Sequence, residues 1–323
     1  MADIAHQERR AAGSSPVRSV KAGNGRSTHI ASRNRSIALI FLLPAVVILF
    51  ATTIYPMLYA LWLSFRNYDL SKPFIPRIFV GVTNYAEVLS SWPFLHALVT
   101  TFKLMAMTLS VQLVLGVGIA LLVTQKLPGM AVVRTLLLIP MMISPVIVGL
   151  VWLFLYFPEL GYLNYFLSVV GIGPIGWITT TDWALTAIAI ADIWQWTPFF
   201  MMGTAAALQS LSPEPYEAAK IDGNSRWDVF RYVTLPQLKP VIVSLLFLRA
   251  IDAFKIYDII FVLTKGGPAD ATEVLSLYIY RQSFTFWRMG VGAAASFVSL
   301  IIITVLITYF FRSMQRSQAA LAR

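Results

Sequence analysis

Long apolar runs set the strongest limit on the fold of this chain. Each run exceeds the roughly 20 apolar residues that a helix needs to cross a bilayer, and each is far longer than a strand of a membrane barrel. Only 12% of the residues are charged, against about a quarter in a soluble domain. We therefore predict an all-α, polytopic membrane protein of six helices, with spans at about residues 37–65, 98–124, 131–157, 183–211, 241–263 and 289–311.

The segments outside these runs are polar or interrupted by proline and glycine. Residues 1–36 hold few large apolar side chains, which predicts a disordered basic tail. Residues 157–182 are too polar to cross a membrane, and we expect an external loop with a short interfacial helix there. The transmembrane domain is then residues 37–312, followed by a short tail at 313–323.

The distribution of Lys and Arg predicts how the spans are oriented. The chain has a net charge of +10, and its basic residues concentrate in both terminal tails, around 126–134 and in 212–240. Fewer of them lie in the alternate segments, and cytoplasmic segments are the ones enriched in Lys and Arg. Both termini and residues 212–240 are therefore expected in the cytoplasm. Because the charge follows this pattern, we expect no nucleic acid as a partner.

The polar segment 212–240 has the local signals of two helices joined by a tight turn. Pro213 suits a first helical turn, where its missing N–H costs nothing. Gly223 stands where a helix ends in a left-handed residue. Ser225 and Asp228 resemble a capping box at the start of the second helix, which Leu235-Pro236 is expected to stop.

The spacing within this segment resembles the EAA loop of ABC importer permeases. That pattern is E-A-A, three residues, G, nine residues, then I-x-L-P, and only Val233 departs from it. The resemblance implies a cytoplasmic coupling helix that docks on an ATP-hydrolysing subunit. The residues that it implicates in coupling are Glu217, Ala218, Ala219, Asp222, Gly223, Leu235 and Pro236.

Two further stretches are similar to the MalF/UgpA-type branch of carbohydrate importer permeases. Upstream of the loop is Trp194-Gln195-Trp196-Thr197-Pro198-Phe199. Downstream are Phe254 to Ile260 and Leu263-Thr264-Lys265-Gly266-Gly267-Pro268, followed by Ala271-Thr272-Glu273. The resemblance implies a MetI-like core in a bacterial cytoplasmic (inner) membrane, and a sugar, oligosaccharide, polyol or glycerol phosphate as the solute.

The same resemblance implies the other parts of the importer. They are a second homologous permease subunit, two nucleotide-binding ATPase subunits and an extracytoplasmic solute-binding protein. ATP and Mg²⁺ belong to the ATPase subunits, so we expect no cofactor, metal or catalytic site in this chain, which is a transport subunit and not an enzyme. The absence of cysteine and of a G-x-x-x-x-G-K-[ST] motif agrees with that expectation.

Ionisable and aromatic residues inside the spans are candidates for the solute path. Charges at membrane depth usually face a cavity or a partner. Arg249 and Asp252 lie three residues apart, and so do Asp252 and Lys255, so a helix would align them as alternating charges. These charges either line the path or neutralise one another, and the aromatic residues either bind sugar or form an interfacial belt. The candidates are Trp152, Tyr156, Gln195, Asp252, Lys255, Tyr257 and Asp258.

Three other functions compete with a sugar importer subunit. A secondary transporter would need a buried carboxylate as an ion site, whereas Asp252 has basic neighbours in sequence. A membrane-embedded enzyme would need a nucleophile with a base, or metal ligands, within the spans. An ABC importer for a non-carbohydrate solute also remains open, since the EAA loop occurs in such systems too.

Overall fold

The computed structural model describes residues 41–125 and 127–321, with side chains as far as residue 312. The expected tail at 1–36, the first residues of the first span and the side chains of the tail at 313–323 therefore lie outside the described part. The chain divides into two units, residues 1–59 and 60–323. In the first unit the chain is helical from Phe41, the first described residue, and this helix includes the π-helical turn η1 (Phe50–Ile54).

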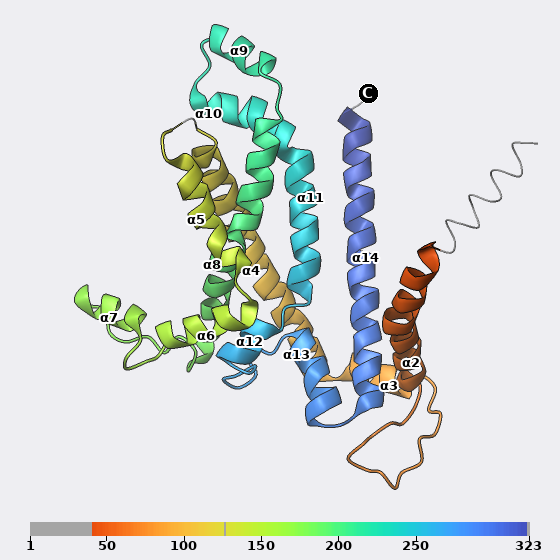
Figure 1. Cartoon of the computed structure of the whole chain (residues 1–323). Coiled ribbons are helices and arrows are strands. Elements are labelled where there is room, and N and C mark those ends of the chain that lie inside the picture. The colour runs from red at the N-terminus through yellow and green to blue at the C-terminus, as the bar shows by residue number, and fades with distance from the viewer. Residues whose placement is uncertain (1–40, 126, 322–323) are drawn as a thin grey trace, which may run out of the picture. The chain divides into compact units, whose positions relative to one another are not determined.

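The second unit is built from helices of very different lengths (Figure 1). The helix that starts in the first unit continues as α2 (Tyr55–Ser64), and its last residues belong to the second unit. The remaining elements are α3 (Thr83–Ser90), α4 (Trp92–Val123), α5 (Met130–Met142), α6 (Pro145–Leu155), α7 (Tyr162–Val169), α8 (Thr181–Gln209), α9 (Glu214–Ile221), α10 (Arg226–Asp228), η2 (Val229–Thr234), α11 (Leu235–Phe254), α12 (Asp258–Leu263), α13 (Leu275–Tyr280), η3 (Arg281–Thr285) and α14 (Met289–Leu321). Within the described residues the only β pairing is an isolated bridge between Arg66 and Phe79. The all-α fold expected from the sequence is confirmed.

Helix α8 is the centre of the second unit. It packs against α4, α5 and α11, and nearly half of its side chains are buried. Gly116 on α4 allows the backbones of α4 and α8 to approach closely. A side chain would not fit there, because a Cβ at this position would lie 2.4 Å from the Cβ of Phe200 on α8. The interior of the unit is therefore formed around two long helices in close backbone contact.

Within the part of the chain that the structure describes, four helical stretches are long and apolar enough to cross a membrane: Phe41–Ser64, Trp92–Val123, Arg226–Phe254 and Met289–Arg312. The pair α5 and α6 makes a fifth candidate if it counts as one bent span. The 29-residue α8 is long enough but less apolar, with Asp182, Asp192 and Gln195 along it. Because its neighbours cover much of it, α8 tolerates polar side chains that a lipid-facing helix would not.

The span expected at 131–157 is not a straight helix. Helices α5 and α6 meet at an angle of 96°. Ile143 and Ser144 between them have extended backbone, and Pro145 occupies the first turn of α6. A residue before proline is pushed out of the helical region, so Ser144-Pro145 ends one helix and begins another. Pro145 is therefore the site of a sharp bend.

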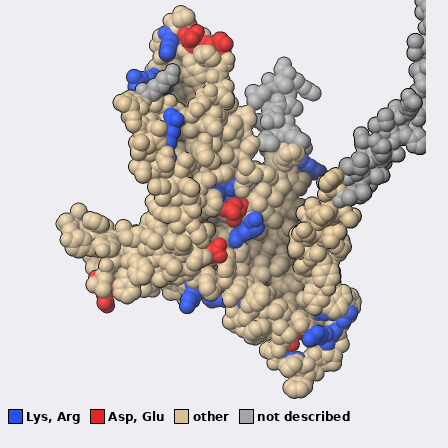
Figure 2. Space-filling view, viewed as in Figure 1, with Lys and Arg blue, Asp and Glu red and all other residues tan. Residues whose placement is uncertain are grey.

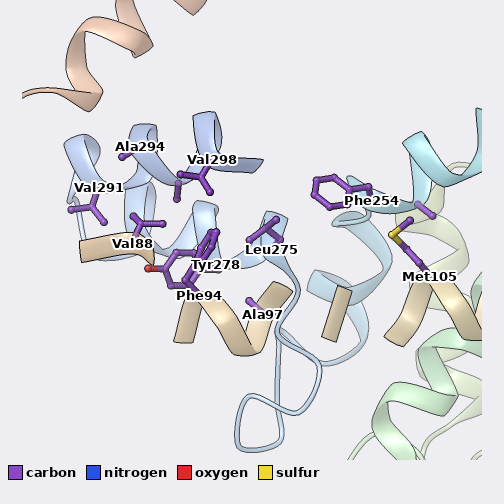
Figure 3. Close-up of a cluster of buried hydrophobic side chains, with 12 residues drawn as sticks. Val88, Phe94, Ala97, Met105, Phe254, Leu275, Tyr278, Val291, Ala294 and Val298 are labelled. Atoms are coloured by element: carbon purple, nitrogen blue, oxygen red, sulfur yellow. The ribbon is translucent and has the colours of Figure 1, made fainter. Parts of the chain in front are cut away.

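A hydrophobic cluster joins the short helices α3 and α13 to the ends of α4 and α14 (Figure 3). Phe94 and Tyr278 form an edge-to-face ring pair with centroids 5.6 Å apart. The backbone N–H of Leu275 donates to the hydroxyl of Thr101, 2.9 Å away, which fixes α13 to α4. The cluster consists of buried residues including Val88, Phe94, Ala97, Leu275, Tyr278, Val291, Ala294 and Val298.

Candidate functional site

The polar segment 212–240 forms the helix and tight turn that its sequence predicts. The backbone N–H groups of Tyr216 and Glu217 donate to the carbonyl of Pro213, 3.0 Å away, which starts α9. Helix α9 carries acidic residues in its first turn and Lys220 in its last, as the helix dipole favours. Ala219 is buried, whereas Glu217 and Ala218 are exposed. Glu217 and Ala218 of the E-A-A pattern are therefore open to a partner.

Gly223 ends α9 with a complete Schellman motif. Its φ is +71°, a conformation that costs a side-chain-bearing residue energy. The N–H of Gly223 donates to the carbonyl of Lys220, and the N–H of Asn224 donates to the carbonyl of Ala219. The hydroxyl of Ser225 then accepts from the N–H of Asp228 at 3.2 Å and caps α10. The glycine turn and the cap are both confirmed.

The expected stop at Leu235-Pro236 is wrong. Helix continues from Arg226 through η2 into α11 and ends only at Phe254. The π-helical turn η2 makes this possible: the N–H of Leu235 donates five residues back, to the carbonyl of Phe230. Pro236, which lacks an N–H, follows in the first turn of α11. Helix α9, the turn at Gly223 and α10 together form a corner, residues 214–228. This corner is thus joined to a membrane-length helix without a break.

A hydrogen bond also holds α9 to this long helix. The hydroxyl of Tyr216 donates to the hydroxyl of Thr234 at 3.2 Å, and Thr234 is buried. By contrast, large apolar side chains at the corner are exposed: Ile221 by 86%, Trp227 by 64% and Tyr232 by 69%. Exposed apolar groups of this size, rimmed by charges, are typical of a protein-binding surface. The α9–α10 corner lies at the same end of the second unit as the α4–α5 connection and the end of α14 (Figure 1).

A buried charged network lies between the helices. The guanidinium of Arg249 on α11 donates to Asp192 on α8 and to Asp252, each at 2.7 Å. Gln112 on α4 donates to the carboxylate of Asp192 at 2.8 Å. The guanidinium of Arg249 also lies 4.7 Å from the ring centroid of Trp196. Arg249 therefore ties α11 to α8, and Asp192 extends the network to α4 through Gln112.

Sequence reasoning found only part of this network. It paired Arg249 with Asp252, which the structure confirms, and it aligned Lys255 on the same helix, which is wrong because α11 ends at Phe254. It missed Asp192 and Gln112 as partners. A carboxylate in a largely apolar run was the available signal, because such a charge requires a partner.

Five of the seven expected path residues line one small cavity of about 100 Å³. They are Gln195, Asp252, Lys255, Tyr257 and Asp258. Two helix breaks meet there: the break between α11 and α12 carries Lys255 and Tyr257, and Gln195 donates to the carbonyl of Ile143 in the bend between α5 and α6, at 3.0 Å. Acidic and basic side chains gather over the lower half of α11, on an otherwise largely uncharged surface (Figure 2).

The other two expected path residues lie elsewhere. Tyr156 is fully buried, and its hydroxyl donates to the carbonyl of Ala187 at 2.7 Å, so it packs α6 against α8. Trp152 lines a separate, mainly apolar cavity of about 480 Å³ together with Trp194, Pro140 and Pro198. Within the described residues, no group of three or more His, Asp or Glu side chains could hold a metal ion.

Comparison with known families and proteins gives a consistent result. Residues 112–320 match the family described as binding-protein-dependent transport system inner membrane component. The trehalose/maltose transport system permease protein MalF of Thermococcus litoralis is 34% identical over 87% of this chain and 94% of its own length. The trehalose transport system permease protein SugA of Mycobacterium tuberculosis is 33% identical over 86% of this chain and 88% of its own.

The fold also occurs in solved structures. A chain of a bacterial ABC transporter involved in the import of the acidic polysaccharide alginate matches with a TM-score of 0.78 at 23% identity, over 90% of this chain and 98% of its own length. The same kind of transporter, in complex with an alginate-bound periplasmic protein, matches with a TM-score of 0.76 at 24% identity, over 88% and 96%. At these identities the likeness concerns the fold.

Proposed function

This chain belongs to the family of binding-protein-dependent transport system inner membrane components, and on that premise we propose that it translocates a sugar or sugar-like solute with energy from ATP hydrolysed in partner subunits. The observation that carries this proposal is the continuous helix from Arg226 to Phe254. One end of it carries the exposed corner, and the other end reaches the charged cavity. A displacement imposed at the corner is thereby delivered to the residues that line the cavity.

The corner is the proposed contact with an ATPase subunit, which would bind ATP and Mg²⁺. Glu217, Ala218, Asp222 and Gly223 are exposed there, as are Leu235 and Pro236 at the start of α11. The small side chain of Ala218 allows close approach of another backbone, and Glu217 offers a charge for a basic partner residue. Since Gly223 and the Tyr216–Thr234 bond hold α9 against η2, docking of α9 would move α11 with it.

The solute class follows from the relatives and from the chemistry of the cavity. Several relatives are named as permeases for trehalose or maltose, which are uncharged polyhydroxyl solutes. Gln195, Tyr257 and the charged groups of the cavity offer donors and acceptors for hydroxyls, and its three carboxylates are accompanied by two cations, Arg249 and Lys255. A cavity of about 100 Å³ is well below the usual 300–1,000 Å³ of a ligand pocket. It must therefore widen, or be completed by the second permease subunit.

The remaining parts of the proposal concern placement and partners. The corner, with its basic residues, would lie in the cytoplasm together with both termini, in a bacterial cytoplasmic membrane. The second permease subunit would cover part of the exposed apolar helix surface. An extracytoplasmic binding protein would deliver the solute to the opposite end, and the alginate-bound periplasmic protein in one structural neighbour supports such a partner.

Purification of the tagged chain from its host in mild detergent tests the assembly. We expect a nucleotide-binding subunit and a second permease to be retained, and vesicles containing the complex and its binding protein to take up labelled trehalose or maltose on addition of ATP. Glu217→Lys should abolish uptake without affecting membrane insertion. The matched reversal Glu159→Lys, on an exposed residue outside the corner, should leave uptake intact. A chain that purifies alone, or only with copies of itself, would instead favour a secondary transporter.

A further inference from the structure

A second polar cavity, of about 300 Å³, lies at the end of the second unit opposite the α9–α10 corner, beside α13 (Figure 1). Three elements form it: the start of α4, the loop between α12 and α13, and the segment from α13 into η3. Its polar lining comprises His96, Asp270, Glu273, Arg281 and Gln282, and Trp92 and Phe286 belong to its wall. It shares no residue with the cavity at the end of α11.

Arg281 holds the acidic side of this cavity in place. Its guanidinium donates to Asp270 at 3.0 Å and also to the carboxylate of Glu273. Its second terminal nitrogen donates to the backbone carbonyl of Lys265 at 2.7 Å. Two carboxylates and the loop that carries them are thus pre-positioned by one rigid, planar group. A polar wall that is ordered before a ligand arrives lowers the entropy cost of binding.

Two aromatic residues stand open beside these polar groups. Trp92 is 74% exposed and Phe286 is 52% exposed, although both are large and apolar. The ring of Trp92 lies 6.3 Å from that of His96, centroid to centroid, so the indole is placed next to a polar ring. An exposed indole beside carboxylates offers an apolar face for C–H groups and acceptors for hydroxyls.

The cavity also contains a hydrogen-bond acceptor that no group in the described part of the chain satisfies. The carbonyl oxygen of the Gln282 side chain is buried without a hydrogen-bond partner, which is costly unless a donor reaches it. Burial raises the pKa of Glu273 to about 7. Near neutral pH its carboxyl group is therefore partly protonated, and it can donate as well as accept. A mixed set of donors and acceptors suits hydroxyl groups better than a simple cation or anion.

We propose that this cavity is an extracytoplasmic binding site for a saccharide, in which a sugar ring stacks on Trp92 while its hydroxyls bind Asp270, Glu273 and Gln282. The inference rests on the proposed function, because it takes a sugar as the solute. Its volume is at the lower end of the range for ligand pockets, which fits a single sugar ring better than a long chain. The site would retain a sugar released at the external face before it enters the cavity beside α11.

The test uses the purified transporter complex in lipid nanodiscs, without its binding protein. Binding of maltose and of trehalose is measured by saturation-transfer NMR and titration. We expect Trp92→Ala, an exposed position, to weaken binding by about tenfold. Phe74→Ala removes a 98% exposed aromatic ring that lies outside the cavity, and it should have no effect.

The outcomes separate this inference from the proposed function. Loss of the signal in Trp92→Ala but not in Phe74→Ala supports the external site. Equal binding by wild type and Trp92→Ala overturns it. If the wild-type complex imports maltose or trehalose yet binds neither at this site, the inference fails and the proposed function stands. If it neither imports nor binds any sugar, both fail.

Discussion

Two arginines organise charged clusters in this chain, and they do so in different surroundings. The side chain of Arg249 is 2% exposed, and it joins Asp192 and Asp252 from helices α8 and α11. The side chain of Arg281 is 28% exposed, and it joins Asp270, Glu273 and a loop carbonyl within one local stretch. The first arginine connects helices that are distant in sequence, whereas the second shapes a loop around a cavity.

The difference shows how burial changes the role of an arginine–carboxylate ion pair. Arg249 and Asp192 are almost fully buried, so water cannot replace a lost partner of either, and each depends on the other. In the cluster around Arg281, water can reach part of the charged groups, and a carboxylate can take up a proton instead. We therefore expect the interior cluster, around Arg249, to govern assembly of the helices. The more exposed cluster, around Arg281, should respond to pH and ligand.

Removing Arg249 should have the largest effect on stability. Arg249→Met leaves Asp192 buried without a cation, and breaking one half of a buried pair costs about 3–5 kcal/mol. We expect poor yield and a strongly lowered melting temperature of the detergent-purified complex. The double variant Arg249→Met with Asp192→Leu removes both charges and should recover much of the loss. Equal instability of the single and double variants would contradict the unpaired-charge explanation.

This interior pair also marks the limit of prediction from sequence. Apolar runs and the signals at Gly223 and Ser225 depend on neighbouring residues, so they could be interpreted without a structure. The pairing of Asp192 with Arg249 joins residues far apart in sequence, and no local pattern contains it. The helix through Leu235-Pro236 was missed for a different reason: a π-helical turn accommodates a proline that normally ends a helix.

The cluster around Arg281 should make stability depend on pH through Glu273. Burial raises the pKa of this carboxyl from 4.5 to about 7, so the folded chain holds the proton more tightly than the unfolded chain. The stability that this tighter proton binding contributes is complete below pH 4.5 and is lost as the pH rises to about 7. Over this range the free energy of unfolding falls by up to about 3 kcal/mol. Melting curves of the complex across this window should show the decline in wild type and a flatter profile in Glu273→Gln. Parallel profiles would assign the pH dependence to other groups.

Replacing Arg281 should be milder than replacing Arg249. Arg281→Gln removes the bonds to Asp270 and Glu273, but Asp270 is exposed to water and Glu273 can become protonated. We expect a loss of about 1–2 kcal/mol in the free energy of unfolding. Faster hydrogen exchange should be confined to the loop between α12 and α13. Lys72→Gln, which removes the exposed ion pair with Asp69, serves as the control with no measurable effect. Exchange that rises equally in α8 and α11 would refute the local role of Arg281.

The smallest expected effect on stability comes from the exposed partner within the interior cluster. The side chain of Asp252 is 53% exposed, so Asp252→Asn should change the free energy of unfolding by less than about 1 kcal/mol, since Asp192 still neutralises Arg249. Yet Asp252 lines the cavity at the end of α11, so sugar uptake at low concentration should fall while the complex remains assembled. Uptake against sugar concentration, measured beside the melting temperature, separates the two effects. Normal uptake by this variant would assign Asp252 to neutralising Arg249 alone, and the solute path would then depend on Gln195, Tyr257 and the residues after the helix break.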